Sequence, residues 1–359
     1  MNKITWIVLL AAAGAVHGAA QDAGKAALEG LDPVLLTEDQ EIPGKEGISL
    51  KHGRFLYQFS TEETRSRFQK DPERYGIQLD GACARMGPPV EGSADAYFVY
   101  NHRIYVFGSS ECYKRFSADP KKYLEVEHPK PDWNPTAETR NRGKELLSKT
   151  ISAIGGAEAL DRIRAYAETR QAKTPHGELT IRIYAKLPDS LVTETVSGDH
   201  TYGSIITAGE ALTFFEGTGR KVPSSFGRAI RANTQRDLLP LLLARSAQGF
   251  DCYAIGRKGN FESLQVNDQG RISTLLLNSE SGRIEAIEWL GASPEGYVTY
   301  HVAYSDYRPV AGLFLPFRAD TTAEGSDVPP GRSWTVASYD LNPADIEAKL
   351  RPSLKIAEQ

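Results

Sequence analysis

Three cysteines are the most reactive side chains in this sequence: Cys83, Cys112 and Cys252. Thiols form disulfides, bind soft metal ions and act as nucleophiles when a base or a positive charge lowers their pKa. Because the count is odd, one disulfide would leave one thiol over. Cys252 lies in the strand-like segment "FDCYAIG" with no base evident beside it, so we interpret it as a buried thiol.

The sequence shows no constellation that is typical of an enzyme. The seven histidines are scattered without a His-x-x-x-His pair, and neither a Gly-x-Ser-x-Gly elbow nor a P-loop is present. Asp306 and Arg308 are close enough in the chain to form a salt bridge within a turn. The formal net charge of -4 disfavours nucleic acid as a partner. We therefore expect a protein without catalytic activity.

The amino terminus predicts export. Lys3 precedes the apolar run "ITWIVLLAAAGAV", and the small residues of "HGAAQD" follow. This pattern is typical of a secretory signal peptide over residues 1–20, cleaved near Gly18 or Ala20. The mature protein is then periplasmic or secreted, in a compartment where disulfides persist.

One phrase of the sequence occurs twice. "TRSRFQKDPERYG" begins at Thr64, and "CYKRFSADPKKYL" begins at Cys112. When the two copies are aligned with one constant difference in residue number, their aromatic, Asp and Pro residues coincide without a gap. In this alignment Asp80 corresponds to Asp32. We interpret 30–78 and 79–126 as two copies of one unit. In each copy a strand hairpin precedes a helix that Ser or Thr begins and Asp-Pro ends, and two such units can share one core.

The second copy resembles the YHS family. That family has a strand ending in Tyr-x-Phe-Cys, then a cysteine on a helix, then Phe-x-x-Asp-Pro-x-x-Tyr, and its members often bind metal through the cysteines. The resemblance covers 30–126, with Cys83 and Cys112 at two cysteine positions and Gly108 at the third. The first copy carries none of these thiols and is expected to be structural; its corresponding residues are Leu35, Thr64 and Ser60.

The resemblance leaves three outcomes open for Cys83 and Cys112. It implies that the fold brings the two thiols together, and the simplest result after export is a disulfide. Such a bond would close a loop of about 30 residues and stabilise the fold by roughly 2–4 kcal/mol. Alternatively the pair binds copper or zinc, with Met86 and His102 as further ligands. The third outcome is two buried thiols that are not linked.

The rest of the chain follows another pattern. Residues 127–136 form a linker rich in Pro and polar residues, and 137–350 form a further domain. "AETRNRGKELLSKTISAIGG" predicts a helix, after which apolar residues alternate as in "ELTIRIYAKL" and "YVTYHVAYSDY". The alternation predicts an antiparallel sheet of about nine or more strands. The leucine-rich segment 234–248, "TQRDLLPLLLARSAQ", predicts a helical lid over its open side. The fold class is therefore α+β.

This layout resembles the half-barrels of the LolA/LppX class, which carry lipoproteins or lipids across the periplasm. Phrases such as "DYRPVAGLFLPFR" add to the likeness, which covers about 140–350. It implies that a lipid or a lipoprotein acyl chain lies between the concave sheet and the helices. The resemblance also implies an arginine that is buried in the cavity. Arg182 points away from the apolar face of its predicted strand, so we do not assign it to that role. The apolar residues that we expect to line such a site are Ile181, Ile183, Phe214, Phe215, Leu238, Leu239, Leu242 and Trp289.

Two other functions stay open. The second YHS-like unit could bind or sense a metal ion through its thiols, or the protein could be a structural envelope component that binds another protein. The ligand hypothesis requires apolar space beneath the lid. The partner hypothesis requires a large exposed apolar patch.

Overall fold

The computed structural model describes residues 25–88, 90–125, 132–174, 177–293, 296–324 and 333–357. The predicted signal peptide lies outside them. The chain forms two compact units. The first unit comprises the residues up to Glu127 with Thr218–Ala229 and Lys355–Gln359, and the second comprises His128–Gly217 and Ile230–Leu354. The sequence did not predict that Thr218–Ala229 and Lys355–Gln359 belong to the first unit. Over the described residues, no helix has both the length and the apolar character needed to span a membrane.

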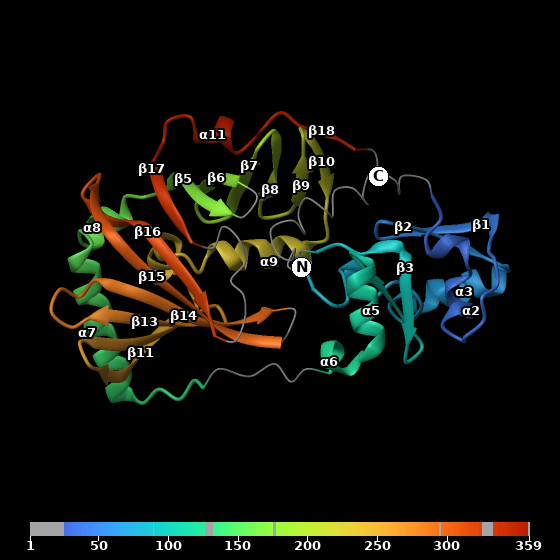
Figure 1. The fold of residues 1–359 in the computed structure, drawn as a ribbon, viewed down its shortest axis with the longest axis horizontal. Helices are drawn as coiled ribbons and strands as arrows, with labels where there is room; N and C mark the ends of the chain where they lie inside the picture. Colours follow the sequence, from blue (N-terminus) through green and yellow to red (C-terminus); the bar gives the residue numbers. More distant parts are fainter. Residues whose placement is uncertain are drawn as a thin grey trace, which may run out of the picture. The chain divides into compact units, whose positions relative to one another are not determined.

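The first unit contains the two predicted hairpin-helix repeats (Figure 1). The first repeat consists of η1 (Leu28–Gly30), α2 (Pro33–Leu36), β1 (Lys45–His52), β2 (Phe55–Phe59), α3 (Glu62–Lys70) and α4 (Pro72–Tyr75). The second consists of η2 (Leu79–Gly81), β3 (Ser93–Tyr100), β4 (Arg103–Phe107), α5 (Ser110–Ala118) and α6 (Lys121–Leu124). The unit also holds β10 (Thr218–Lys221) and β18 (Lys355–Ile356), which pair in parallel.

Local chemistry explains why the two longer helices of the repeats begin and end where they do. The hydroxyl of Thr61 accepts a hydrogen bond from the backbone N–H of Thr64 at the start of α3, and Ser109 does the same for Cys112 at the start of α5. These caps satisfy N–H groups that have no partner within the helix. Both helices end at the aspartate of an Asp-Pro pair, as expected.

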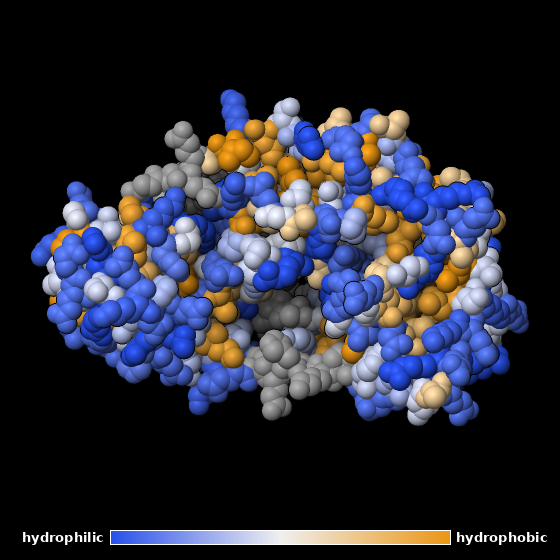
Figure 2. All heavy atoms as spheres, turned by 180° about the vertical axis from the view of Figure 1, so that it is seen from behind, coloured by the Kyte–Doolittle hydropathy of each residue, from blue (hydrophilic) through white to orange (hydrophobic). Residues whose placement is uncertain are grey.

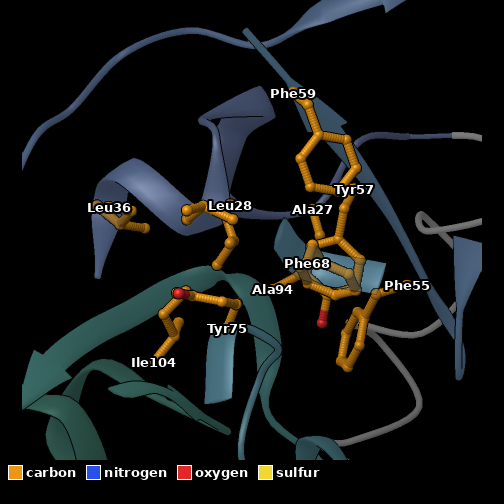
Figure 3. Close-up of a cluster of buried hydrophobic side chains, with 11 residues drawn as sticks. Ala27, Leu28, Leu36, Phe55, Tyr57, Phe59, Phe68, Tyr75, Ala94 and Ile104 are labelled. Atoms are coloured by element: carbon orange, nitrogen blue, oxygen red, sulfur yellow. The ribbon is translucent and has the colours of Figure 1, made fainter. Parts of the chain in front are cut away.

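One buried cluster contains residues of both repeats. Tyr57 and Phe59 of β2 pack against Phe68 of α3, with ring centroids 4.8 and 5.4 Å from the Phe68 centroid (Figure 3). Ala94 and Ile104 of the second repeat belong to the same buried cluster. This cluster joins the two repeats, and the second repeat has a further cluster of its own around Phe116.

The backbone corrects the alignment at the opening of the two repeats. The N–H of Asp32 bonds to the carbonyl of Ile42, and the N–H of Cys83 bonds to the carbonyl of Val90. The preceding turns also match, because Leu28–Gly30 and Leu79–Gly81 both have positive φ angles throughout. Asp32 therefore corresponds to Cys83, whereas the gap-free alignment paired Cys83 with Leu35. The first repeat has extra residues after Asp32, and these explain why the gap-free alignment is wrong at the opening of the repeats.

The second unit consists of helices and a large antiparallel sheet. Within this unit the sheet runs from β11 to β9, and these two strands are not paired with each other in the described structure. Its helices are α7 (Ala137–Ala153), α8 (Ala157–Asp161), α10 (Leu238–Leu243) and α11 (Ile346–Lys349), with α9 (Ser224–Thr234) entering from the first unit. The strands follow the order β11 (Phe250–Lys258), β12 (Phe261–Asp268), β13 (Arg271–Asn278), β14 (Ile284–Ser293), β15 (Gly296–Val310), β16 (Leu313–Ala323), β17 (Trp334–Leu341), β5 (Ala165–Thr174), β6 (Gly177–Lys186), β7 (Ser190–Ser197), β8 (His200–Ile206) and β9 (Ala211–Phe215).

The predicted alternation on β6 is largely correct. Leu179, Ile183 and Ala185 are buried, as expected for one face of a strand. Leu187 continues the same alternation in the sequence, but it lies beyond the end of the strand and is exposed. The α+β class and the open antiparallel sheet thus agree with the expectation.

Helix α7 lies directly on β11, with no side chain between the two backbones at Gly143. A Cβ atom on Gly143 would lie 2.6 Å from the Cα atom of Tyr253. Thr136 caps the helix through a reciprocal capping box with Thr139, and Gly155 and Gly156 follow its end with positive φ.

Replacing Gly143 by alanine is expected to destabilise the second unit by about 1–3 kcal/mol, because the added methyl group pushes α7 away from β11. Elsewhere in a helix the same change stabilises by about 1 kcal/mol. Chemical denaturation of the full chain measures the effect. Asn141→Ala, at an exposed position of the same helix, is the control and should be neutral or stabilising. A stabilised Gly143→Ala variant would show that the close contact is wrong.

Candidate functional site

A hollow lies between the sheet of the second unit and the segment 233–237, where the predicted lid begins. Its volume is about 180 Å³. We call it the lid hollow; its lining residues are Arg170, Ile181, Ile183, Thr193, Asn233, Thr234, Asp237, Trp289, Val302, Thr321 and Trp334. It is smaller than typical small-molecule pockets, which occupy roughly 300–1,000 Å³.

The structure brings together only some of the predicted ligand-binding residues. Ile181, Ile183 and Trp289 line the lid hollow. The lid residues Leu238, Leu239 and Leu242 are buried in α10 but do not line the hollow.

Phe214 and Phe215 lie elsewhere. Phe214 packs in a separate cluster with Ile346 and Leu350, at and just beyond α11. The Phe215 ring stacks on His200, with the centroids 5.7 Å apart. Alternation identifies two faces of a strand but does not say which face lies beneath the lid, so the sequence could not separate these residues from the others.

Arg170 is the main feature that the sequence analysis missed. It is 7% exposed, and its guanidinium makes two hydrogen bonds to the Glu168 carboxylate, at 2.7 and 2.9 Å. It also forms an ion pair with Asp237 at 2.8 Å and lies over the Trp334 ring, with Cζ 4.2 Å from the centroid. The sequence pattern that could have revealed it is "YAETRQA", in which Glu168 and Arg170 alternate on the same strand face as Tyr166.

Asp237 connects the lid to this buried charge. It stands at the N-cap position of α10, but its side chain makes no capping hydrogen bond and pairs with Arg170 instead. An aspartate at this position usually binds the free N–H groups of the helix. The ion pair therefore ties the first turn of α10 to β5 at some cost to the helix itself.

The environment of Arg170 keeps it charged. Burial by itself would lower its pKa, but Asp237 and Glu168 more than offset this effect and hold the pKa above its usual value. Burial raises the pKa of the neighbouring Tyr166, Tyr304 and Tyr339, so these phenols stay neutral. The hollow thus has a mixed lining: aliphatic and tryptophan side chains lie beside threonines, Asn233 and the ion pair of Arg170 with Asp237.

The first unit places Cys83 and Cys112 side by side. Both are free thiols in the structure, so a disulfide between them stays a prediction. The two cysteines belong to one small buried cluster, together with Phe107 and Phe116. Nη1 of Arg85 lies 3.7 Å from the Cys112 sulfur and 3.5 Å from the Met86 sulfur.

The four residues proposed as metal ligands do not come together. Nδ1 of His102 lies 2.9 Å from the carbonyl oxygen of Thr37, and the residue borders an open hollow with Asp71 and Arg103 instead. In the part of the chain that the structure describes, no three His, Cys, Asp or Glu side chains gather around a possible metal position. A metal site would have to use the two thiols and Met86.

Cys252 is buried on β11, in agreement with its interpretation as a buried thiol. Burial raises its pKa to about 11. It therefore serves as an internal reference for the reactivity of the other two cysteines.

The exposed apolar side chains bear on the partner hypothesis, which stays a prediction. On the face that Figure 2 shows, hydrophobic residues lie in several groups among hydrophilic ones. The exposed large apolar side chains come from separate segments and include Ile42, Leu79, Tyr113, Ile255 and Phe314. Scattered apolar residues of this kind are normal on protein surfaces.

Comparisons with known proteins give only a distant likeness. No family model matches the chain, and no curated protein matches it. A lipoprotein-sorting protein domain from Vibrio parahaemolyticus aligns with 8% identity and a TM-score of 0.35, over 59% of this chain and 98% of that one. A LolA superfamily protein from Nitrosomonas europaea aligns with 10% identity and a TM-score of 0.37, over 56% and 94% of the two chains. Scores of this size say nothing about ligand or activity.

Proposed function

We propose that the second unit binds a hydrophobic molecule with a polar end, such as a lipid or a lipoprotein acyl chain, without catalysis. The observation that carries the proposal is the lid hollow itself. Ile181, Ile183 and Val302 offer aliphatic walls, two tryptophans offer flat apolar faces, and Asp237 offers a polar contact at the lid. Ligand sites in proteins commonly combine apolar walls with a few convergent polar groups.

The small volume implies that the lid moves when a ligand enters. The α10 helix has only six residues, contains Pro240 and lacks a side-chain cap, so its own backbone contributes little to its stability. Its position depends on the burial of its leucines and on the ion pair between Asp237 and Arg170. An acyl chain that displaced the leucines would bury its own methylene groups in the same space, at about 0.8 kcal/mol each.

We propose that the protein is exported, which puts this activity outside the cytoplasm, in the periplasm or beyond the cell. Acyl chains cross water there only when a protein covers them. A binding unit without a catalytic group fits that task.

Ile181→Trp is expected to weaken binding of a fluorescent fatty-acid analogue at least tenfold, because the indole fills the lid hollow. The probe is titrated into the full mature chain and then displaced with unlabelled palmitate. Thr180→Trp is the matched control: it adds the same side chain at the adjacent position of β6, on the other face of the strand, and should bind like the wild type.

Native mass spectrometry of protein from its own host provides the complementary test. We expect an adduct with the mass of a lipid that Ile181→Trp removes. If the wild-type protein carries no lipid and does not bind the probe, the proposal is wrong. Equal binding by both tryptophan variants would place the ligand elsewhere.

A further inference from the structure

The two repeats have different chemistry at one equivalent position. In the first repeat, Oδ2 of Asp32 accepts hydrogen bonds from the Ser60 N–H at 2.7 Å, the Ser60 hydroxyl at 2.8 Å and the Thr64 hydroxyl at 2.6 Å. In the second repeat, Cys83 and Cys112 occupy the places of Asp32 and Thr64. A closed hydrogen-bonded cluster in one repeat thus corresponds to two adjacent thiols in the other.

We propose that Cys83 and Cys112 form a redox-active dithiol that exchanges with organic disulfides. This inference concerns the first unit and goes beyond the proposed ligand binding. Three observations of geometry support it: the two cysteines lie in one buried cluster, the Arg85 guanidinium lies beside the Cys112 sulfur, and Cys112 is the more exposed of the two.

Exposure assigns the roles of the two cysteines. Cys112 is 7% exposed, whereas Cys83 is fully buried at 0%. An external disulfide therefore meets Cys112 first, and Cys83 can react only with a partner already attached to Cys112. Cys83 is the resolving cysteine in this scheme.

The exchange balances without any further reagent. The Cys112 thiolate attacks one sulfur of a disulfide RSSR, forming Cys112–S–S–R and releasing RS⁻. Cys83 then loses its proton and attacks the Cys112 sulfur, which forms the Cys83–Cys112 disulfide and releases the second RS⁻. The two thiolates take up protons, so two protein thiols are oxidised while one RSSR is reduced to two RSH.

The surroundings favour the thiolate form at Cys112. The neighbouring Cys83 thiol makes the largest contribution, and with Ser109 and Arg85 it outweighs burial and lowers the Cys112 pKa to about 5. The interaction with Cys112, together with burial, raises the pKa of Cys83. Arg85 is itself buried, and an adjacent thiolate neutralises part of its charge.

Oxidised glutathione is the probe for this proposal. The full mature chain carrying Cys252→Ala is equilibrated with mixtures of reduced and oxidised glutathione, and its thiols are then mapped by mass spectrometry. We expect a Cys83–Cys112 disulfide that reduced glutathione reverses. Cys83→Ala should stop at a Cys112–glutathione adduct, and Cys112→Ala should leave Cys83 unmodified.

Alkylation of the wild-type chain gives a second readout that requires no variant. At pH 7, iodoacetamide should modify Cys112 at least 100-fold faster than Cys252, and the Cys112 rate should rise with a midpoint near pH 5. Arg85→Gln, which keeps both thiols, should slow the exchange at least tenfold.

Three outcomes would overturn the proposal. One is that Cys112 stays reduced in folded protein under conditions that oxidise the denatured chain. Another is that the two single-cysteine variants form glutathione adducts equally well. The third is that protein from its host holds copper or zinc on the two thiols and exchanges only after a chelator removes the metal.

Discussion

Replacing Arg170 by methionine should lower the free energy of unfolding of the second unit by about 3–5 kcal/mol, the usual cost of removing one partner from a buried charge cluster. The substitution leaves Glu168, which is 2% exposed, without its bidentate partner. It also breaks the only ion pair that the described structure shows between the lid residue Asp237 and the sheet. Both consequences lower the free energy of unfolding.

The measurement is denaturant unfolding of the full chain, together with hydrogen exchange by mass spectrometry on β5 and α10. We expect α10 to lose protection more than β5 does, because it loses its connection to the sheet. Faster access of a hydrophobic probe to the lid hollow should accompany this change.

Arg182→Met is the matched control. Arg182 lies on the next strand and pairs with Glu194, but both side chains are partly exposed to solvent. Ion pairs in such positions contribute about 0–1 kcal/mol, since water and salt screen them. Similar losses for the two variants would contradict the assignment of Arg170 as a buried structural charge.

A second substitution tests the cause. In the Arg170→Met background, Glu168→Gln removes the carboxylate that has lost its partner and should recover part of the stability. If the double variant is no more stable than Arg170→Met, the loss comes from packing against Trp334 and not from the unpaired charge.

Asp32→Ala is expected to destabilise the first unit by at least about 3 kcal/mol, because several buried donors lose their acceptor at about 1–3 kcal/mol each. The carboxylate receives hydrogen bonds from the N–H groups of Val34 and Ser60 and from the hydroxyls of Ser60 and Thr64. Asp32 is fully buried, so water cannot replace it.

Cys83→Ala is the matched variant, since Cys83 holds the equivalent place in the second repeat. It removes one small apolar atom and one weak hydrogen bond, so the reduced protein should lose only about 1–2 kcal/mol. Hydrogen exchange on β2 and α3 for Asp32→Ala, and on β4 and α5 for Cys83→Ala, measures the two effects in the full chain. Equal losses would mean that the two positions are not equivalent.

The sequence was sufficient for features that depend on neighbours in the chain. Helix caps at Thr61 and Ser109, the Asp-Pro ends and the alternation of β6 follow from residues within a few positions of one another. The repeat was also visible, because aromatic and proline positions coincide. The opening of the first repeat was misaligned, since the extra residues after Asp32 leave no clear mark on the side-chain pattern.

Tertiary structure decided everything that depends on partners far apart in the chain. Arg170 meets Asp237 only because the lid folds back across β5, and His102 is kept from the thiols by its place at the β3–β4 turn. Alternation showed that the strands have an apolar face. Only the tertiary fold determined that Ile181 faces the lid and Phe214 faces α11. The physical reason is that propensity and periodicity act locally, whereas burial and charge pairing depend on which distant segments meet.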